Sequence, residues 1–516
     1  MRCSHLIPEL VLLGAAAADY SPLARRDLLI TPAVQVACDQ LNSIAPNSTY
    51  FPNSTAYETQ RINVWDKRAN LYPACIHMPS TAEDVARAVA IFHQHKVPFA
   101  VKGGGHMNVR ITQVHNDHDK FPGSNTIDDG ILLALNDLNH LKVHPDENTI
   151  EVGPGNRWVD VYGALGPYGK YAIGGRLKTI GVPGLTLIGG VHYFLNKYGF
   201  SMDNVLSYDI VLGNGTQVVA SAAANPELFW ALKGGGSNYG IVTKFLLKTY
   251  DIPQVTSTMQ VYTEKAIPAF IKAACDLALD DHPSVGAGAV ININYNTTTN
   301  EAIPQVFGLQ ETTESPPSLF ANFTAIPDAT IRVHNVTTPV QWHSQLETPN
   351  QMFRLSIQFA HKTIKPDSER LYEIYQSWIE AIQDVADVEG LRPTFILNLV
   401  PRTALTVAKT NGVGNAFGLD DDQSYIWWQY TTSWARAEDD LRMTAWHRSL
   451  LEREHSINKQ KGLATEFIYM GDAGEFQSPF PEYGAGNMEK MRQIRDAYDP
   501  DLTFTKLNWG GFKLGY

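Results

Sequence analysis

Positive charge is scarce in this sequence and is nowhere concentrated. Among 516 residues there are 41 Lys and Arg against 53 Asp and Glu, which gives a formal net charge of -12 at pH 7. Proteins that bind nucleic acid neutralise its phosphates with clustered Lys and Arg, so we expect no nucleic-acid partner. Beyond the first residues the chain also lacks an unbroken apolar run of about 18 residues, so we expect no membrane span.

Two common nucleotide-binding signatures are missing as well. No Gly-X-Gly-X-X-Gly stands between a strand and a helix with an acidic residue about 20 positions later, which excludes a nicotinamide site of that type. The phosphate-binding sequence Gly-X-X-X-X-Gly-Lys-Ser/Thr is also absent. With 44% hydrophobic and 18% charged residues the chain has the composition of an ordered globular protein, and its length predicts two or three folding units.

The N-terminus has the pattern of a secretory signal peptide over residues 1–18. Arg2 precedes an apolar stretch from Leu6 to Leu13, and small residues follow from Gly14 to Ala18. Pro8 and Glu9 interrupt this stretch, which is too short to cross a bilayer. We therefore expect a secreted, extracellular protein, in which glycans could occupy surface sequons at Asn47, Asn53, Asn214, Asn296, Asn322 and Asn335.

The chain has only four cysteines. Cys3 would leave with the signal peptide. Cys38 and Cys75 flank the entry to the first folded region, and we expect them to form a disulfide in an oxidising compartment. Cys275 lies in a helix-like segment, residues 266–279, and is expected to be a buried thiol.

From residue 71 helical and strand patterns alternate regularly. Ser80–Asp84 has the form of a capping box, and apolar residues then recur at helical spacing until Pro98. Gly213–Gly215 separates two alternating runs and predicts a hairpin turn. We expect a compact α+β region that ends near Asp251 and contains strands Pro98–Lys102, Leu132–Leu135 and Thr149–Val152, helix Val159–Leu165, and hairpin strands Asn204–Leu212 and Gln217–Ala220.

Beyond Pro253 longer strands alternate with amphipathic helices, which predicts an antiparallel sheet backed by helices. From about Thr465 the sequence is rich in Gly, Tyr and Phe, and we expect the chain to return there to the first region. The expected units are residues 69–252, 253–464 and 465–516. The second unit is defined by strands Ser257–Tyr262, Ala289–Tyr295, Arg354–Ala360 and Ile426–Thr432, and by helices Ser368–Ala386 and Glu438–Glu454.

The sharpest motif is Phe99–His106, an apolar strand that ends in three glycines and a histidine. Glycines permit positive φ and let backbone N–H groups approach an anion closely, so a pyrophosphate could lie in this turn. A flexible loop is the alternative for three glycines taken alone. Two more glycine-containing runs follow in order, at residues 174–190 and 227–243.

In order and spacing these three runs resemble the FAD-binding domain of the vanillyl-alcohol oxidase and p-cresol methylhydroxylase (PCMH) superfamily, in its berberine-bridge-enzyme-like branch. Tyr498–Pro500 and Gly510–Leu514 resemble the C-terminal signature of the fungal form of that branch, so the likeness covers nearly the whole chain. It implies an α+β fold: a two-lobed PCMH-type FAD-binding domain, made of the N-terminal part plus a C-terminal return, with an antiparallel-sheet-plus-helices substrate domain.

The resemblance also implies which residues bind FAD. Lys102–Met107 would cradle the pyrophosphate, Gly174–Gly190 would line the isoalloxazine, and Gly240–Val242 would pair with the polar edge of the flavin. In this branch the histidine that ends the first run is bonded to a flavin methyl group, and His106 stands there; a polar cap on the turn is the alternative. The implied cofactor-binding residues are Lys102, Gly103, Gly104, Gly105, His106, Met107, Gly174, Gly175, Ile180, Gly181, Gly184, Gly189, Gly190, Asn204, Gly240, Ile241 and Val242.

A second covalent bond to the flavin is not expected. Many relatives place a cysteine just before the Thr-Val/Ile-Gly step of the second run, and here that residue is Leu177, so there is no cysteinyl link. A single bond through His106 would still prevent loss of the cofactor outside the cell and make the flavin a stronger oxidant. Ile180 stands where relatives place a residue that controls oxygen access, which leaves both oxygen and another electron acceptor open.

Flavin oxidation usually needs a base that takes the proton of the substrate. The resemblance favours Tyr469, in an expected strand at Phe467–Met470, with Trp427, Gln429 and Tyr430 lining the substrate side. The alternative for each of them is a residue in a core strand. The expected catalytic residues are therefore Tyr469, Tyr430 and Gln429.

Two groups of histidines do not favour a metal site. His93 and His95 are two apart on a helix, so their side chains point in different directions. Residues 115–119 hold two histidines and two aspartates in a polar segment that is typical of a solvated loop. We expect no metal.

The expected function is oxidation of a small organic metabolite by hydride transfer to FAD, in fungal secondary metabolism. Its partners would be a small-molecule substrate and oxygen or another electron acceptor. An extracellular carbohydrate oxidase of the same branch is the nearest alternative, although Leu177 argues against the open groove that double attachment permits. The third is a redox-silent flavoprotein, either a cyclase or a binding protein.

Overall fold

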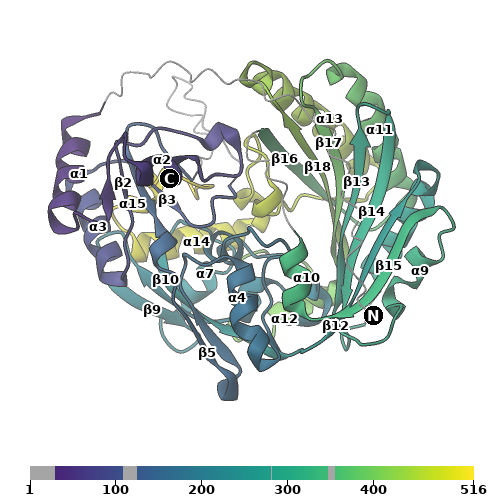
Figure 1. The fold of residues 1–516 in the computed structure, drawn as a ribbon, viewed down its shortest axis with the longest axis horizontal. Coiled ribbons are helices and arrows are strands. Elements are labelled where there is room, and N and C mark those ends of the chain that lie inside the picture. Colours follow the sequence, from purple (N-terminus) through teal and green to yellow (C-terminus); the bar gives the residue numbers. More distant parts are fainter. Residues whose placement is uncertain (1–29, 108–124, 281, 347–354, 516) are drawn as a thin grey trace, which may run out of the picture.

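The computed structural model describes residues 30–107, 125–280, 282–346 and 355–515. Figure 1 shows two lobes side by side. One holds the purple to blue segments together with yellow C-terminal segments, and the other is a large teal to green sheet with its helices. The mixed helix and sheet architecture confirms the predicted α+β fold class.

The first lobe begins with a four-stranded sheet of β1 (Thr49–Tyr50), β2 (Cys75–His77), β4 (Ile131–Ala134) and β3 (Phe99–Lys102), in that order. The last three strands run parallel. Thr81 and Asp84 form the predicted capping box with two reciprocal hydrogen bonds of 3.1 Å. The helices of this part are α1 (Pro32–Ile44), α2 (Thr55–Ile62) and α3 (Ala82–His95).

A five-stranded antiparallel sheet completes the first lobe, in the order β5 (Leu141–His144), β6 (Thr149–Val152), β10 (Ile241–Lys248), β8 (Val205–Val211) and β9 (Gln217–Ser221). The β8–β9 pair, with Gly215 at φ +85° in its turn, confirms the predicted hairpin. Helix α3 is sandwiched between the two sheets, because its Val89 lies in one core with Ile131 and Val211. Around this sheet lie α4 (Trp158–Leu165), α5 (Val182–Leu187), α6 (Leu195–Tyr198), α7 (Pro226–Ala231) and the short pair β7 (Lys170–Tyr171) and β11 (Tyr250–Asp251).

The second lobe is an eight-stranded antiparallel sheet, as the sequence predicted. Its order is β15 (Ala329–Thr337), β12 (Val255–Tyr262), β14 (Glu301–Gln310), β13 (Ala287–Asn296), β17 (Arg392–Val400), β18 (Tyr425–Trp434), β16 (Ser356–Ile364) and β19 (Ala464–Thr465). One face packs against α8 (Ile267–Leu279), α11 (Ser368–Ile382) and α13 (Asp440–Gln460), and α11 and α13 form the outer layer in Figure 1. The remaining helices are α9 (Ala321–Thr324), α10 (Pro339–Gln345) and α12 (Arg402–Ala408). The other face of the sheet is turned to the first lobe.

The prediction of a strand at Phe467–Met470 is wrong. The preceding strand, β19, ends at Thr465, and Tyr469 precedes a 3-10 turn, Met470–Asp472. Side chains of β16 capture the backbone carbonyls that a strand would use: Thr363 donates to Phe467 O at 2.6 Å, and His361 Nε2 donates to Tyr469 O at 3.1 Å. The segment is thus held beside the sheet without joining it.

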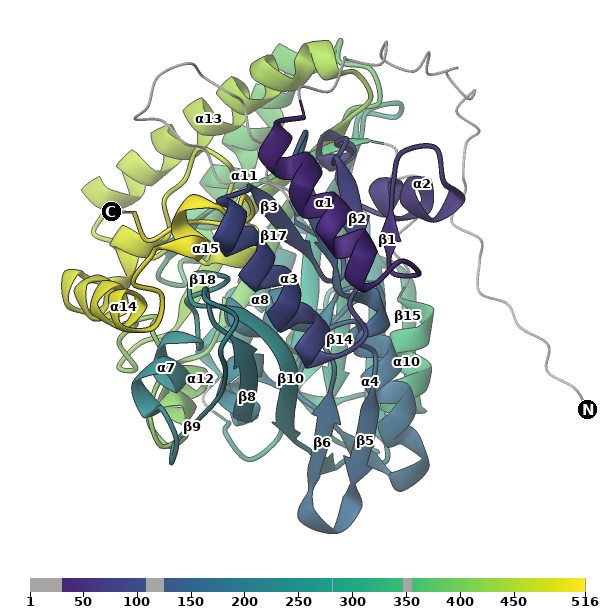
Figure 2. The same ribbon diagram turned by 90° about the vertical axis from the view of Figure 1, so that its left-hand side faces the viewer.

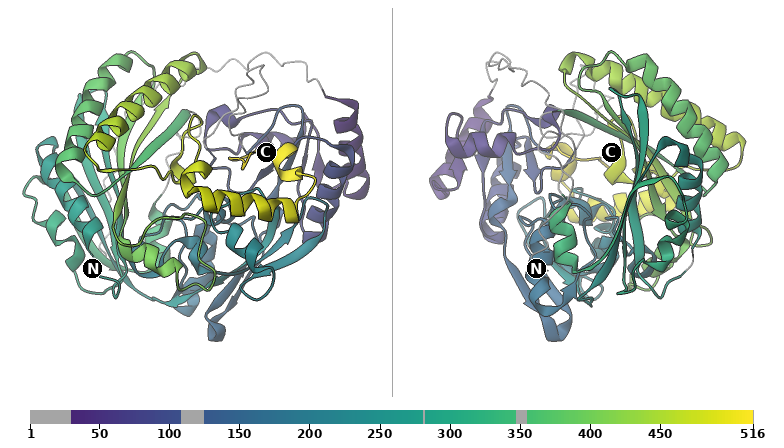
Figure 3. Two further views of the ribbon diagram at one scale, coloured as in Figure 1. Left: turned by 180° about the vertical axis from the view of Figure 1, so that it is seen from behind. Right: turned by 45° about the vertical axis from the view of Figure 1, so that its right-hand side comes forward.

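The C-terminal segment returns to the first lobe, as predicted. After α14 (Ala485–Tyr498) and α15 (Thr503–Lys506), Asn508 forms a parallel bridge with Phe99 at the free edge of β3. The Asp499 carboxylate accepts hydrogen bonds from the Thr503 and Phe504 backbone N–H groups and so organises the turn before this bridge. Figure 2 places the yellow segment beside the purple strands, and Figure 3 shows it from behind, between the two lobes.

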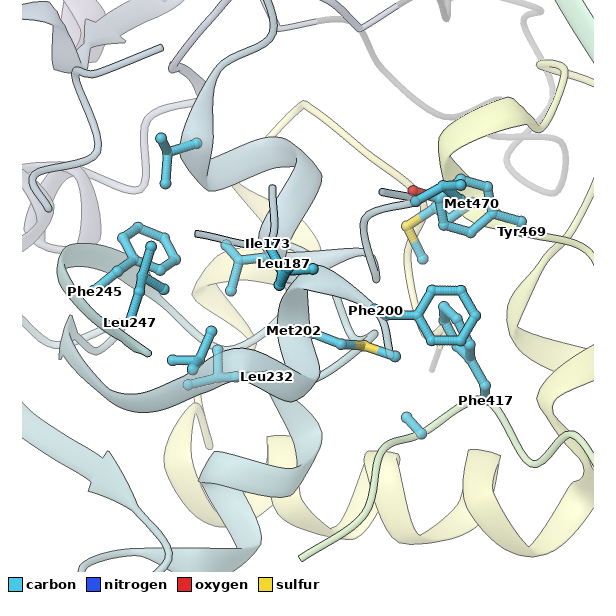
Figure 4. Close-up of a cluster of buried hydrophobic side chains, with 14 of the residues drawn as sticks. Ile173, Leu187, Phe200, Met202, Leu232, Phe245, Leu247, Phe417, Tyr469 and Met470 are labelled. Atoms are coloured by element: carbon cyan, nitrogen blue, oxygen red, sulfur yellow. The ribbon is translucent and has the colours of Figure 1, made fainter. Parts of the chain in front are cut away.

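The largest core cluster reaches from the five-stranded sheet to the boundary between the lobes. Figure 4 shows part of it, from Phe245 and Leu247 on β10 past Met202 to Tyr469 and Met470. Because these side chains are buried in one core, the C-terminal segment is packed closely against the first lobe.

Several features bear on the expected export of the protein. The predicted disulfide is confirmed, since Cys38 on α1 is bonded to Cys75 on β2. Cys275 is the predicted buried thiol. No helix within the described ranges is long and apolar enough to cross a membrane. Residues 1–18 lie outside the described residues. Asn296 is partly exposed, and the exposed sequon residues are Asn47, Asn53, Asn214, Asn322 and Asn335.

Candidate cofactor and substrate site

A cavity of about 400 Å³ lies where the glycine-rich segments meet the eight-stranded sheet. Its lining includes Gly104 after β3, Ile180 before α5, Ile396 on β17 and Gly511 near the C-terminus. A second cavity of about 20 Å³ lies next to it, and Arg176 lines both. This second cavity has room for little more than water. The large cavity is therefore the candidate site.

The first two glycine runs pack back to back, and this contact needs glycine on both sides. A Cβ on Gly104 would lie 2.4 Å from the backbone N of Gly181, and a Cβ on Gly181 would lie 2.5 Å from the backbone N of Gly104. Gly105 has φ +76°, and a Cβ there would lie 2.6 Å from the carbonyl oxygen of Asn63. Only glycine fits these positions, so bare backbone forms this part of the cavity wall. Such a wall suits the close approach of an anionic group.

His106 follows this turn and lines the cavity. Its Nε2 atom is buried, and none of the described residues forms a hydrogen bond with it. The indole of Trp65 stacks on the ring, with centroids 5.6 Å apart and planes inclined by 20°. Burial, helped by the guanidinium of Arg157, lowers the pKa of His106 to about 3. The imidazole is therefore neutral near pH 7 and keeps a nitrogen lone pair for bond formation.

Most of the predicted cofactor-binding residues line the cavity together. They come from all three glycine-containing runs, which the fold brings to one place. The members are Gly103, Gly104, Gly105, His106, Met107, Ile180, Gly181, Gly184, Gly240, Ile241 and Val242. Leu177, at the position where a cysteinyl link was excluded, also lines it.

Six other predicted residues do not line the cavity: Lys102, Gly174, Gly175, Gly189, Gly190 and Asn204. Lys102 is fully buried and its Nζ donates to the carbonyl of Gln60. A Cβ on Gly174 would lie 2.0 Å from the Trp158 ring, so this glycine allows α4 to pack closely. The amide of Asn204 donates to two nearby backbone carbonyls, at 2.9 Å each. These residues support the segments that line the cavity but do not line it themselves.

Tyr469, one of the predicted catalytic residues, lines the cavity. Its ring stacks on Trp427 with centroids 4.6 Å apart and planes inclined by 16°. Its hydroxyl oxygen accepts a hydrogen bond of 3.2 Å from the Gly190 N–H. Burial, and next the charge of Asp472, raise the pKa of the Tyr469 phenol. The phenol therefore keeps its proton at neutral pH.

The alternation of β18 separates the two other predicted catalytic residues. Gln429 lines the cavity, but Tyr430 points to the opposite face, into the core under the helices. There its ring stacks on Trp378 at 6.3 Å. Because adjacent strand residues face opposite sides of a sheet, both could not have lined the substrate side. Tyr430 therefore leaves the candidate list.

A polar cluster, of which sequence reasoning had named only Gln429 as a catalytic candidate, forms the sheet side of the cavity. Arg176 Nη2 donates to Asn398 Oδ1 at 2.9 Å. Asn398 Nδ2 in turn donates to Asp472 Oδ2 at 2.7 Å and to Gln429 Oε1 at 3.4 Å. Arg176 lies inside the second glycine run, and Asp472 lies three residues after Tyr469. Their charge and their position next to these motifs were the signals that could have identified them as site residues. Other lining residues without such a signal are Trp65, Val290, Phe359 and Ile396.

A buried chain of hydrogen bonds fixes the backbone of Arg176. The Phe194 N–H donates to His192 Nδ1 at 3.0 Å, so His192 Nε2 carries the proton and donates to the Tyr171 hydroxyl at 2.9 Å. Tyr171 then donates to His343 Nε2 at 2.5 Å, and His343 Nδ1 donates to the Arg176 carbonyl at 3.0 Å. Burial lowers the pKa of both histidines, so each stays neutral. This series of hydrogen bonds links α10 to the cavity wall.

Of the two histidine groups considered for a metal, the structure describes only His93 and His95. His93 faces Thr503 at 3.0 Å and His95 faces Gln40 at 2.9 Å, so they point to different partners. Residues 115–119 lie outside the described residues. In the part of the chain that is described, no three His, Cys, Asp or Glu side chains gather where they could hold a metal ion.

Comparison with known sequences identifies the cofactor. Residues 73–221 match a family described as FAD binding domain. A FAD-dependent monooxygenase of Penicillium roqueforti is 30% identical over 93% of this chain and 93% of its own. Another FAD-dependent monooxygenase, from Cochliobolus heterostrophus, is 32% identical over 86% of this chain and 85% of its own.

Solved structures share the fold at low identity. BBE-like 1 of Physcomitrella patens is 20% identical, with a TM-score of 0.69 over 93% of this chain and 99% of that one. Xylooligosaccharide oxidase of Myceliophthora thermophila is 19% identical, with a TM-score of 0.71 over 92% and 99%. Glucooligosaccharide oxidase of Acremonium strictum, which carries a 6-S-cysteinyl, 8α-N1-histidyl FAD, is 20% identical, with a TM-score of 0.70 over 93% and 100%.

Proposed function

We propose that this chain, which belongs to a family of FAD-linked oxidoreductases, lies in the berberine-bridge-enzyme-like branch of the vanillyl-alcohol oxidase superfamily and oxidises a small organic metabolite with FAD bonded to His106. The observation that carries the proposal is the cavity itself. Its lining combines bare glycine backbone that ends at a neutral histidine with the polar cluster on the sheet side.

The residues of the cavity fit FAD. The Gly104–Gly181 contact leaves backbone that can approach a pyrophosphate, since any side chain there would fill the space. The buried Nε2 of His106, which no described residue satisfies, supports attachment of the imidazole to the cofactor. Leu177 offers no thiol, so we propose a single covalent bond. The cofactor-binding residues are those of the three glycine-containing runs that line the cavity.

FAD, when bound, supplies an acceptor for a hydride and its two electrons. The chain supplies position and polarity. Val290, Phe359 and Ile396 present apolar surface to the substrate and exclude water from that side. Arg176 and Gln429 offer hydrogen bonds to its oxygen atoms. A substrate that is partly apolar, with a few oxygen atoms, suits this wall.

The same wall argues against the carbohydrate alternative. A sugar carries a hydroxyl on nearly every carbon, and those that face Val290, Phe359 and Ile396 and not the polar cluster would stay unpaired. The oligosaccharide oxidases share the fold with this chain at 19–20% identity, which does not transfer their substrates. The fungal relatives are FAD-dependent monooxygenases, which supports a small metabolite as substrate, in secondary metabolism, and oxygen as one acceptor.

We further propose that the protein is secreted and that residues 69–252 and 465–516 form the FAD-binding unit around a substrate unit at 253–464. The disulfide between Cys38 and Cys75 supports an oxidising compartment, and the exposed sequons are accessible to glycosylation. The bridge between Phe99 and Asn508 supports assigning the C-terminal segment to the FAD-binding unit.

The attachment is tested by denaturing the purified protein with acid. A yellow pellet is expected for the wild type, because the covalent bond survives unfolding, whereas His106→Ala should release its flavin to the supernatant. His144→Ala is the matched control, because His144 pairs with Glu151 on the β5–β6 hairpin and does not line the cavity. A His106→Ala pellet that stays yellow would place the attachment elsewhere.

The reaction itself is tested by an anaerobic screen of alcohols, phenols, enols and oligosaccharides. Bleaching of the flavin by a small alcohol, phenol or enol is the expected result. Bleaching by oligosaccharides alone would establish the carbohydrate oxidase. A flavin that no compound bleaches would support the redox-silent alternative.

A further inference from the structure

A carboxylate lies on the substrate side of the cavity, next to the residue that family resemblance favours as the base. Asp472 ends the 3-10 turn Met470–Asp472, and among the described lining residues it is the only acidic one. The amide of Asn398 donates to its Oδ2 at 2.7 Å, and this bond fixes the direction of the carboxylate. Asn398 in turn is held by Arg176.

The surroundings of Asp472 determine its charge. Burial raises the pKa of the carboxyl to about 6, while the guanidinium of Arg176 and the hydrogen bond from Asn398 act in the opposite direction. Among the described lining residues the other titratable groups, besides Arg176, are the Tyr469 phenol and the His106 imidazole, and both stay neutral at pH 7. Asp472 is therefore ionised at pH 7, yet it is a stronger base than an exposed carboxylate.

Tyr469 is less suited to accept a proton. Its hydroxyl oxygen is already bonded to the Gly190 N–H, and its proton is retained because burial and the neighbouring Asp472 both oppose a phenolate. A base must be free of its proton when the substrate arrives. Of the two groups, the carboxylate meets this condition at neutral pH.

We propose that Asp472 is the catalytic base of this enzyme and that the substrate carries a hydroxyl, phenolic or enolic O–H group directed at it. The proposal rests on the proposed function. The O–H proton passes to the Asp472 carboxylate, and the hydrogen of the reacting C–H group leaves with its electron pair to the FAD that the function already requires. A carbonyl or its conjugated equivalent is formed in the substrate. Arg176 stabilises the oxygen while it loses its proton, and Asp472 afterwards gives the proton to water.

The first experiment needs no substrate. The visible absorbance of the flavin in the holoenzyme is titrated between pH 4.5 and 8, because a charge that appears in the cavity that would hold the flavin is expected to change its spectrum. The wild type should give an inflection at about pH 6, Asp472→Asn should lack it, and Tyr469→Phe should keep it. A wild type without an inflection, or an Asp472→Asn variant that retains it, would overturn the proposal.

The second experiment uses a compound that bleaches the flavin in the screen. Wild-type kcat/KM should rise tenfold per pH unit up to about pH 6 and then level off, because only ionised Asp472 accepts the proton. Asp472→Asn should lower the plateau value of kcat/KM by a factor of about 10²–10⁴ and abolish its rise with pH. Tyr469→Phe should preserve this rise, and Asp472→Glu should recover part of the rate.

The two experiments separate the failure of this proposal from failure of the proposed function. If no compound bleaches the flavin, the oxidoreductase reaction fails, while the absorbance titration still reports whether Asp472 ionises beside the cofactor. If substrate is oxidised and Tyr469→Phe removes the rising limb while Asp472→Asn keeps it, the function stands and Tyr469 is the base.

Discussion

The back-to-back contact of Gly104 and Gly181 predicts that Gly104→Ala will weaken both the fold and the binding of FAD. The added Cβ would lie 2.4 Å from the N and 2.5 Å from the Cα of Gly181, where ordinary contacts are 3.4–4 Å. Both neighbours are backbone atoms, so no side chain can turn away. The two runs must move apart by about 1 Å, and the bare wall between them is distorted.

Overpacking of this kind costs about 1–3 kcal/mol. For a folding unit of about 150–250 residues, each kcal/mol lowers the melting temperature by about 2–4 °C, so a fall of roughly 2–12 °C is expected. The flavin-to-protein absorbance ratio should fall as well, because both runs line the cavity. Thermal melting and that ratio are measured on the same preparation.

Gly163→Ala is the matched control, since Gly163 lies within α4 and a Cβ there meets nothing within 4 Å. Alanine in a helix should stabilise the protein by about 0.4–1 kcal/mol, a change of opposite sign. A Gly104→Ala protein with unchanged melting temperature and full flavin content would refute the reasoning, as would an equal loss in both variants.

Two further predictions concern access to the flavin and the first disulfide. Ile180 lines the cavity, so we expect its side chain to restrict access of oxygen to the flavin. The substrate-reduced enzyme should then reoxidise slowly in air but quickly with a quinone, and Ile180→Val should accelerate only the reaction with air. Equal rates in air for both proteins would rule out this restriction. The disulfide between Cys38 and Cys75 spans 37 residues, so Cys75→Ser should lower the free energy of unfolding by about 4 kcal/mol, measured by thermal melting with Cys275→Ser as the control. Reducing the wild type should lower its melting temperature to that of Cys75→Ser and no further.

Local signals were enough to predict much of the first lobe. The capping box at Thr81–Asp84 and the Gly215 turn are determined by neighbouring residues, and both are confirmed. The glycine turn before His106 was singled out because glycines let backbone N–H groups approach an anion closely, and its role as a cofactor cradle came from the family resemblance. Its contact with Gly181 was not foreseeable, since it joins segments more than 70 residues apart.

The errors arise where tertiary contacts or a simple periodicity were overlooked. Phe467–Tyr469 has strand-like residues, but side chains of β16 capture its carbonyls. Tyr430 was placed beside Gln429 although the strand period of two puts them on opposite faces. Arg176 and Asp472 lay beside quoted motifs, and only the fold reveals that Asn398 joins them.

The C-terminal bridge has a consequence for the order of events in the cell. Ribosomes make the chain from its N-terminus, so Asn508 and the lining residues Gly510–Phe512 are synthesised after every other part of the cavity. Until they emerge, the free edge of β3 has no partner and one wall of the cofactor site is missing. We therefore expect full retention of FAD only after these residues are in place, and a chain truncated before Asn508 should hold less flavin.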